Sequence, residues 1–308
     1  MHVVRVALPV PLPQLFDYTS ENVSESDVGR CVRVPFGPAE KNGVILAIDP
    51  PDGITPERLK SVLAIQRDAP ALPADWLALV DFAARYYQHP LGEVIALALP
   101  PRLRRADAVA GDEVDPLLDV TPDGHLALGR STRESRALAV VRRLAAEGAV
   151  RRAALRAAEG AAVADALRRG WLAASAADEP ARMATAPELT EEQRAAVARL
   201  ADGFGRYQPF LLVGVTGSGK TEVYLRLVRE AITRGGQALI LVPEIALTPQ
   251  LEARVAGRFP AARVVSLHSG LGEAARSQGF VQALEGRADI VLGTRLAVGA
   301  DDRHQQRA

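Results

Sequence analysis

The spacing of hydrophobic positions changes along the chain and divides it into parts. Residues 3–48 hold short β-branched runs separated by Gly and Pro turns, a pattern that predicts a small β-rich domain able to close into a barrel. Residues 76–87 carry one apolar helical face and predict a helix that ends at Pro90. The pair Pro100 and Pro101, with three arginines close behind, indicates the exit into a linker.

The middle of the chain, residues 106–180, is rich in Ala, Arg and Leu. It predicts helices over residues 133–147, 151–158 and 161–169, and a short strand pair after Gly170. Three short helices with a small strand pair fit a winged-helix-like domain. Any small helical bundle between two domains would give the same pattern.

From residue 187 onward, apolar runs of strand length alternate with stretches of helical period. Strands that alternate with helices predict βαβ units and a parallel sheet. The expected strands cover residues 210–215, 237–242, 263–267 and 289–292, and the expected helices cover residues 221–234, 249–258 and 273–285.

A glycine-rich segment joins the first of these strands to the first helix. Residues 214–221 match the phosphate-binding pattern G-x-x-x-x-G-K-[ST], in the strand, loop and helix context that the pattern requires. Glycine tolerates the dihedrals that turn backbone N–H groups onto a triphosphate, and the helix N-terminus adds partial positive charge. Lys220 would reach the β- and γ-phosphates, and the Thr221 hydroxyl would coordinate Mg²⁺. The expected nucleotide-binding residues are Gly214, Gly217, Ser218, Gly219, Lys220 and Thr221.

Polar residues also follow the later strands, in the loops at residues 243–250, 268–270 and 293–295. Each loop alone is an ordinary strand-to-helix connection. Because α/β sheets bind ligands at the carboxyl ends of their strands, three such loops beside the phosphate loop favour a functional surface there. Upstream, residues 189–193 can cap and open a helix, and their residue chemistry alone indicates only a helix start.

Composition narrows the classes of protein that remain. With 48% hydrophobic residues and 37 basic against 37 acidic side chains, the chain is not disordered in bulk. Its net charge gives no ground for nucleic-acid binding, so evidence for such binding must come from local sites. Cys31 is the only cysteine, so internal disulfides and multi-cysteine zinc sites are excluded and a reducing, cytoplasmic location is expected. Pro9, Pro11 and Pro13 would break a signal helix, and no apolar run is long enough to span a membrane, so no membrane partner is expected.

Four segments of the last part occur together at spacings typical of one family. They read Gly-Val-Thr-Gly-Ser-Gly-Lys-Thr-Glu-Val-Tyr-Leu from residue 214, Leu-Val-Pro-Glu-Ile-Ala-Leu-Thr-Pro-Gln from 241, Leu-His-Ser-Gly-Leu from 267 and Gly-Thr-Arg from 293. With these segments, residues 187–297 closely resemble the first RecA-like lobe of the PriA family, the primosomal N′ replication-restart helicases of superfamily 2.

The amino-terminal part shares further motifs with the same family. Residues 106–180 loosely match its winged-helix domain, and segments at residues 6–13, 16–18, 33–37 and 86–92 resemble its domain for binding a DNA 3′ end. By position, the residues that match the pocket for a 3′-terminal nucleotide are Phe16, Asp17, Gly37 and Lys60. Their chemistry agrees, because these residue types can stack on a base, accept a hydrogen bond from a 3′-hydroxyl, allow close backbone approach and neutralise a phosphate. A core aromatic beside a turn aspartate is the structural alternative for the first two.

The resemblance implies an ATP-driven 3′-to-5′ DNA helicase that recognises stalled replication forks and reloads the replication machinery. ATP and Mg²⁺ are the implied cofactors. The implied partners are branched or 3′-ended DNA, single-stranded-DNA-binding protein and other primosome proteins. By position, Gln193 would read the adenine edge, and the loops after two strands would touch DNA through Thr248, Gln250, Thr294 and Arg295.

The chain departs from the family pattern near residue 298. There the family continues to a strand that ends in Asp-Glu-Glu-His and to a second lobe with cysteine-ligated zinc and an arginine finger. The resemblance therefore predicts an amino-terminal fragment with no zinc site and no useful ATP hydrolysis or unwinding on its own. The expected fold is multi-domain α/β, with a β-rich 3′-end-binding domain at residues 1–105, a winged-helix-like domain at 106–180, a truncated P-loop RecA-like lobe at 181–298 and an aberrant tail at 299–308.

Two other classes of function remain open on the sequence. One is a non-catalytic module that binds DNA ends and keeps its phosphate loop only as a fold element; affinity for nucleotide separates it from the helicase. The other is an unrelated P-loop regulator, against which the 3′-end pocket residues argue.

Overall fold

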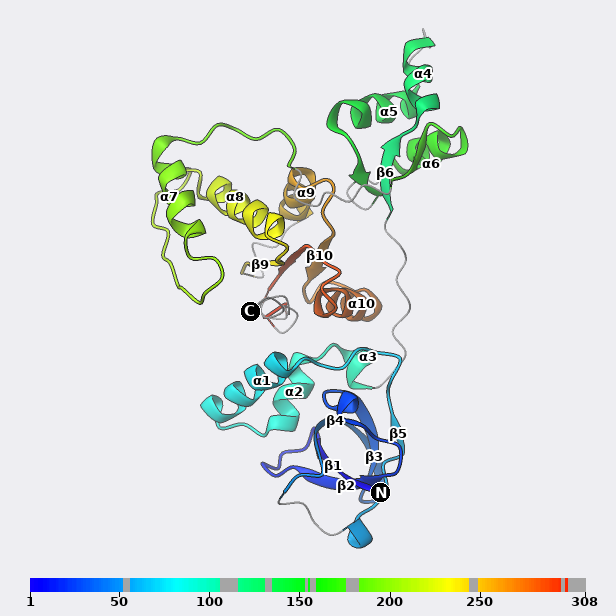
Figure 1. The fold of residues 1–308 in the computed structure, drawn as a ribbon, viewed down its shortest axis with the longest axis vertical. Helices are drawn as coiled ribbons and strands as arrows, with labels where there is room; N and C mark the ends of the chain where they lie inside the picture. Colours follow the sequence, from blue (N-terminus) through cyan, green and yellow to red (C-terminus); the bar gives the residue numbers. More distant parts are fainter. Residues whose placement is uncertain are drawn as a thin grey trace. The chain divides into compact units, whose positions relative to one another are not determined.

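The structure is a computed structural model, and Figure 1 shows its fold. It describes residues 1–51, 56–105, 116–130, 135–152, 155, 159–175, 183–243, 249–294 and 297–298. By their contacts, the residues form two compact units. The first unit takes its residues from Met1–Asp112, Val265–Arg287 and Val291–Ala308, and the second from Glu113–Val264 and Ala288–Ile290.

A five-stranded antiparallel sheet forms the centre of the first unit. Its strands are β1 His2–Ala7, β2 Phe16–Ser20, β3 Cys31–Phe36, β4 Ala39–Ile48 and β5 Ala64–Ile65. They lie in the order β2-β1-β4-β3-β5. The hairpin of β3 and β4 turns between Phe36 and Ala39, where Gly37 supplies a positive φ of 60°.

The two edge strands of this sheet are linked through the backbone. The Thr19 N–H in β2 donates to the Lys60 carbonyl at 2.9 Å, and the Thr19 carbonyl accepts from the Val62 N–H at 2.9 Å, just before β5. The sheet therefore curls back toward a small barrel, as the spacing of its turns predicts. Inward-pointing side chains form a core of Val4, Val6, Leu8, Val10, Tyr18, Val32, Val34 and Ile45.

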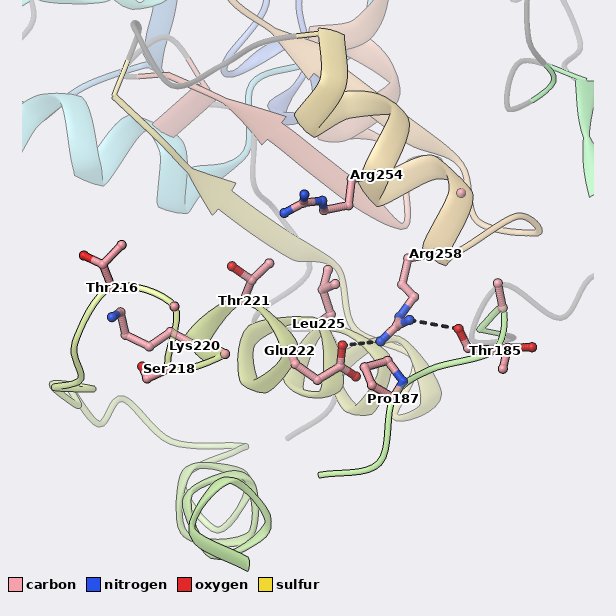
Figure 2. Close-up of a pocket in the computed structure, with 14 residues that line it drawn as sticks. Thr185, Pro187, Thr216, Ser218, Lys220, Thr221, Glu222, Leu225, Arg254 and Arg258 are labelled. Carbon is pink, nitrogen blue, oxygen red and sulfur yellow. Dashed lines mark hydrogen bonds and ion pairs between the residues drawn. The ribbon is translucent and has the colours of Figure 1, made fainter. Parts of the chain in front are cut away.

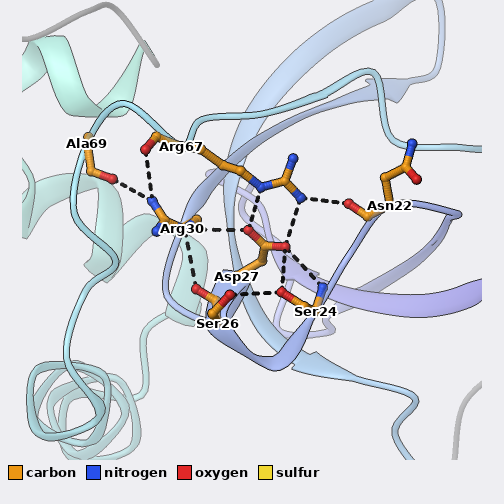
Figure 3. A network of polar contacts seen from close by, with 7 residues as sticks. All are labelled: Asn22, Ser24, Ser26, Asp27, Arg30, Arg67 and Ala69. Carbon is orange, nitrogen blue, oxygen red and sulfur yellow. Dashed lines mark hydrogen bonds and ion pairs between the residues drawn. The ribbon is translucent and has the colours of Figure 1, made fainter.

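A buried carboxylate with two arginines joins distant loops of this barrel (Figure 3). Asp27 ends the 3₁₀ helix η1, Glu25–Asp27, and its side chain is 2% exposed. Arg67 donates to the two carboxylate oxygens at 2.9 and 2.8 Å, and Arg30 lies 3.4 Å from one of them. The Ser24 N–H donates to the same carboxylate at 3.0 Å. The Arg67 hydrogen bonds, aided by Ser24, hold the pKa of Asp27 below its usual range.

Helices follow the sheet along the first unit. They are α1 Ala74–Tyr87, α2 Leu91–Ala98 and α3 Pro101–Arg104, after a 3₁₀ turn, η2, at Pro56–Arg58. The buried residues of α1 are Trp76, Val80 and Ala84, on the apolar face that the sequence predicts. A side chain at Gly92 would clash with the Leu8 backbone, so glycine there lets α2 pack closely on the chain that leaves β1.

The first unit also holds most of the carboxyl-terminal elements. These are β10 Val264–Leu267, α10 Glu273–Leu284 and β11 Ile290–Gly293, and β10 and β11 are hydrogen-bonded neighbours. Helix α10 buries Phe280, Val281 and Leu284. Its first residue, Glu273, forms an ion pair of 2.6 Å with Arg105, the residue after α3.

A small α/β layer begins the second unit. It consists of β6 Leu117–Val120, α4 Pro122–Arg130, α5 Arg136–Glu147, β7 Val150–Arg151, α6 Gly160–Arg168 and β8 Leu172–Ala174. The strands form an antiparallel sheet in the order β7-β6-β8. Ser135 caps α5, because its hydroxyl accepts from the Leu138 N–H at 3.2 Å. The helices and strands share a core of Leu118, Ala137, Val140, Val141, Leu144, Val150, Val163, Ala166 and Leu172.

The rest of the second unit carries the glycine-rich segment. Its elements are α7 Glu191–Ala201, α8 Lys220–Thr233, β9 Ala238–Leu241 and α9 Pro249–Arg258. Helix α8 buries Val223, Leu225, Val228 and Ile232. The Ala238 N–H donates to the Asp289 carbonyl at 3.0 Å, so β9 begins beside the residues that precede β11.

One predicted element is wrong, and a second is contradicted at its first residue. Residues 210–215 form no strand, and the side chains of Leu211 and Val213 are 88% and 82% exposed. A strand is stabilised by hydrogen bonds to a neighbouring strand, which hydrophobic spacing does not supply. The helix expected over residues 151–158 lies mostly outside the described residues, but its first residue, Arg151, lies in β7, pairs with Leu117 and donates its N–H to the Pro260 carbonyl at 2.6 Å. These tertiary contacts outweigh helix propensity.

The other expected helices and strands are present, with ends shifted by a few residues, and the mixed α/β class is confirmed. The strand after Gly170, β8, pairs with β6, a partner about fifty residues upstream, and the residues that would complete a local hairpin lie outside the described residues. Residues 299–308, the expected tail, lie outside the described residues. None of the described helices combines the length and the apolar content that crossing a membrane requires.

Candidate nucleotide and DNA-end sites

The expected phosphate loop lies at the start of α8. Gly217 and Gly219 have positive φ angles of 84° and 79°, which residues with side chains rarely adopt. Gly219 directly precedes the helix, so the first N–H groups of α8 point out of its amino end. This is the backbone arrangement that receives an anion at a helix N-terminus.

The Lys220 side chain folds back over its own loop. Its Nζ atom donates to the carbonyl oxygens of Gly214 at 2.6 Å and Val215 at 2.9 Å. A bound phosphate would take this ammonium from the two carbonyls. Because hydrogen bonds between charged groups are stronger than those to neutral carbonyls, the exchange favours the phosphate.

Gln193 connects α7 to the phosphate loop. Thr190 caps α7, and the Gln193 Oε1 atom accepts from the Thr190 N–H at 3.0 Å to complete a capping box. The other end of the same amide, Nε2, donates to the Ser218 carbonyl at 3.0 Å. The structure therefore brings Gln193 to the loop, and its contact with adenine stays a prediction.

The loop forms one wall of a cavity of about 810 Å³ (Figure 2). Residues 216–222 line one side of it, and Arg254 and Arg258 of α9 line the other. Thr185 and Pro187 contribute a further edge. A volume of several hundred Å³ is typical of pockets for cofactors, so the cavity has room for a nucleotide.

An ion-pair cluster fixes α9 against the helix that carries the loop. Glu222, in the first turn of α8, accepts from Arg226 at 2.8 Å and forms a close ion pair with Arg258. Arg258 also donates to the Thr185 carbonyl at 3.0 Å, and Arg226 donates to the Pro187 carbonyl at 2.9 Å. Figure 2 shows the Arg258 guanidinium between Glu222 and Thr185. The same carboxylate thus fixes one wall and one edge of the cavity.

The groups around this cavity fit a nucleoside triphosphate with Mg²⁺. The Lys220 ammonium and the amino end of α8 suit phosphate oxygens, and the Thr221 hydroxyl suits Mg²⁺. Within the described ranges, no three His, Cys, Asp or Glu side chains gather into a metal-binding group. Mg²⁺ usually keeps several waters and is bound through substrate phosphates, so an ion beside Thr221 would take most of its ligands from phosphate and water.

The expected 3′-end residues of the first unit lie in β2, at the β3–β4 turn and between η2 and β5. Phe16 opens β2, is half-buried against the barrel core, and meets Phe36 edge-on with ring centroids 5.3 Å apart. Gly37 follows Phe36, and a side chain there would meet no atom within 4 Å. Lys60 is exposed and bonded through its carbonyl to β2. Their role in holding a 3′ end stays a prediction.

Asp17 is bound to an arginine of the neighbouring strand. Arg5 stands opposite it in the register of β1 and β2, and donates to both carboxylate oxygens at 2.9 and 3.0 Å. The Asp17 side chain is 7% exposed. Successive residues of a strand point to opposite faces, so Phe16 and Asp17 lie on different faces of β2. Both could contact one ligand only if that ligand reached around the end of β2.

The four residues expected to touch the DNA strand have different positions. Thr248 and Arg295 lie outside the described residues. Gln250 is exposed in the first turn of α9. Thr294 is 4% exposed, and its N–H donates to the Leu267 carbonyl at 3.2 Å.

The sequence reasoning missed three arginines of these sites: Arg5, Arg254 and Arg258. The pairing of Arg5 with Asp17 follows from the register of β1 and β2, which the sequence pattern does not predict. The other two are four residues apart on a predicted helix, a spacing that places them on one face. This spacing could have indicated that the two arginines share a face of the helix. It does not show which other element packs against that face.

Two family models match the chain. One is described as the 3′DNA-binding domain (3′BD) of PriA and matches residues 5–100. The other is described as the DEAD/DEAH box helicase and matches residues 190–304. The first covers the barrel and the helices α1 and α2, and the second covers the phosphate loop with the helices α8 and α9 on the two sides of its cavity.

Three similar proteins are all replication restart proteins named PriA. The chain is 32% identical over 321 residues to the replication restart protein PriA of Haemophilus influenzae, in an alignment that covers 97% of this chain and 42% of that protein. It is 46% identical over 113 residues to PriA of Synechocystis sp., covering 37% and 13% of the two chains. It is 26% identical over 314 residues to PriA of Chlamydia pneumoniae, covering 92% and 40%. The chain thus spans about two fifths of the relatives that it matches over its whole length. By these matches it belongs to the PriA family of replication restart proteins.

Proposed function

We propose that the chain acts in replication restart, as the part of an ATP-dependent 3′-to-5′ DNA helicase that holds a DNA 3′ end and a nucleotide. The observation that carries this proposal is the pairing, in one chain, of a matched 3′DNA-binding domain at residues 5–100 with a matched helicase domain at residues 190–304. The glycine-rich loop and the cavity beside it support the nucleotide part. The expected ligands are ATP with Mg²⁺ and branched or 3′-ended DNA.

The proposed domains keep the boundaries expected from the sequence, at residues 1–105, 106–180 and 181–298. Three helices around the strand order β7-β6-β8 support a winged-helix-like domain in the middle. The alternation of α8, β9, α9, β10, α10 and β11 supports a RecA-like lobe. Single-stranded-DNA-binding protein and other primosome proteins are proposed partners on the resemblance alone.

A second function has support from the loop itself. The apolar residues 210–215, which lead into the loop, are not part of a sheet, so no strand fixes the start of the loop. This observation favours a module that binds DNA ends without using nucleotide. Calorimetric titration of the chain with ATP and Mg²⁺ separates the two functions, because only the first predicts binding.

The DNA-end function predicts preference for a free 3′-hydroxyl. A 3′-phosphate would place a dianion near the Asp17 carboxylate and remove the hydroxyl donor, which should weaken binding by about 10-fold, as expected for a lost charge-assisted hydrogen bond. Asp17→Asn should reduce this discrimination. Fluorescence anisotropy with two oligonucleotides that differ only at the 3′ end measures it.

Asp81→Asn is the matched control for this measurement. Asp81 is also paired with an arginine, Arg85 at 2.9 Å, but lies on α1. Its replacement should leave the discrimination unchanged. Equal affinity for the two oligonucleotides in the wild type, or equal discrimination in the wild type and Asp17→Asn, would remove Asp17 from the pocket.

The nucleotide function predicts selection for adenine through Gln193. Gln193→Ala should bring the affinities for ATP and GTP together, because it removes the one side chain proposed to read the base edge. Calorimetry with both nucleotides measures the ratio, and circular dichroism checks that the chain keeps its helix content although the Gln193 half of the α7 capping box is removed. A wild-type chain that binds GTP as well as ATP would contradict the role of Gln193.

A further inference from the structure

We infer that Arg254 of α9 is a second cationic ligand of the nucleotide phosphates, and that it sets how strongly the cavity holds a polyphosphate chain. This inference rests on the proposed nucleotide-binding function. It concerns a residue on the wall opposite the glycine-rich loop, outside the phosphate-binding pattern itself. It assigns this wall a role in binding phosphate in addition to closing the cavity.

The position of Arg254 is the first step. Its side chain lines the same cavity as Lys220 and Thr221. Figure 2 shows its guanidinium extending from α9 into the open space on the Thr221 side, away from the cluster that holds Arg258. Arg254 therefore faces the place where a phosphate chain bound to the loop would lie.

The orientation of α9 is the second step. Residues four apart on a helix share a face, so Arg254 lies one turn before Arg258 on the same side of α9. Arg258 is fixed by Glu222 of α8 and by the Thr185 carbonyl. Because this anchor turns the shared face toward α8, it also directs Arg254 toward the cavity.

The charge balance of the cavity is the third step. Of the arginines that contribute here, Arg226 and Arg258 are both bound to Glu222. Arg254 is exposed, and its guanidinium has no ion-pair or hydrogen-bond partner among the residues that the structure describes. A triphosphate carries several negative charges, and Lys220 is a single cation. The unpaired Arg254 guanidinium would add a second positive charge beside the triphosphate. It could bind there without first breaking an ion pair.

The chemistry of the side chain is the last step. A guanidinium stays charged at any physiological pH, and its fork of N–H donors matches two phosphate oxygens at once. A lysine at this position would supply the charge without the fork. Arg254→Lys is therefore expected to bind ATP with an affinity between those of the wild type and Arg254→Gln.

The test compares Arg254→Gln with Arg229→Gln in the full chain. Arg229 is an exposed arginine of α8 that does not line the cavity, so it is the matched control for loss of one charge. Calorimetry should show ATP binding weakened by about 10-fold in Arg254→Gln and unchanged in Arg229→Gln, given the strength of charge-assisted hydrogen bonds. Tripolyphosphate, which has no base, should show the same loss as a competitor of ATP.

The outcomes separate this inference from the function on which it rests. If Lys220→Ala abolishes ATP binding while Arg254→Gln binds both ATP and tripolyphosphate as the wild type does, Arg254 is no ligand and the nucleotide function stands. If the wild type binds neither compound, both fail. A loss for ATP without a loss for tripolyphosphate would place Arg254 near the base and overturn the phosphate assignment.

Discussion

Replacing Lys220 with alanine is expected to weaken ATP binding by about 100-fold or more, because two charge-assisted hydrogen bonds of about 1.5–3 kcal/mol each are lost. In the structure, the Lys220 ammonium already lies on the loop, held by the Gly214 and Val215 carbonyls. Its transfer to phosphates needs only an exchange of acceptors. The remaining donors, the N–H groups at the start of α8, cannot replace its full charge.

Calorimetry with ATP and Mg²⁺ measures this loss, and Lys41→Ala is the control. Lys41 lies in β4, with its ammonium 5.9 Å from the centre of the Phe36 ring, and belongs to the other unit of the structure. Its removal changes the net charge equally and should leave ATP affinity unchanged. Retention of wild-type affinity in Lys220→Ala would mean that nucleotide does not use the loop.

Asp27→Ala is expected to destabilise the amino-terminal barrel by about 3 kcal/mol, the effect typical of breaking a buried and hydrogen-bonded ion pair. The change leaves Arg67, Arg30 and the Ser24 N–H without the carboxylate that joins them. Arg67 is half-exposed and can turn to water, which places the effect at the lower end of the range for buried pairs. Glu40→Ala, which removes an exposed pair with Arg33, should cost less than about 1 kcal/mol.

Hydrogen–deuterium exchange resolved by peptide measures both variants within the full chain. Faster exchange should be confined to the barrel, while α5, in the other unit, serves as an internal reference. Equal protection in Asp27→Ala and Glu40→Ala would mean that the buried network does not stabilise the barrel.

The same network predicts a pH dependence. The pKa of Asp27 is lower in the folded chain than its ordinary value of about 3.9, so its contribution is fully present above that value. It is lost as the pH falls through the lower folded pKa. Asp27→Asn should therefore be less stable than the wild type near neutral pH, and the difference should shrink below about pH 4.

Local signals made the phosphate loop predictable from the sequence. The positive φ angles of Gly217 and Gly219 and the helix that starts at Lys220 all depend on neighbouring residues, which one short pattern contains. The cap of α7 is equally local, since Thr190 and Gln193 are three residues apart. The contact of Gln193 with the loop spans 25 residues and has no local signal; the family resemblance gave Gln193 a role at adenine and not this contact.

Distant pairings explain what the sequence did not show. Arg5 reaches Asp17 because β1 and β2 pair in one register, and Arg67 reaches Asp27 across 40 residues without a periodic signal. Arg151 lies in a strand and not in the expected helix, because it pairs with Leu117 of a strand that is distant in the sequence. Hydrophobic spacing shows which face of an element is buried, but it does not show which element covers that face.

The measurement that tests the account most directly compares linear and circular single-stranded DNA of the same sequence as ligands of the full chain. A circle keeps every base and phosphate but has no 3′ end. If the barrel at residues 5–100 holds a 3′ terminus, the linear strand should bind at least about 10-fold more tightly than the circle, and the excess should fall in Asp17→Asn. Equal affinity for the linear and the circular strand would contradict the account.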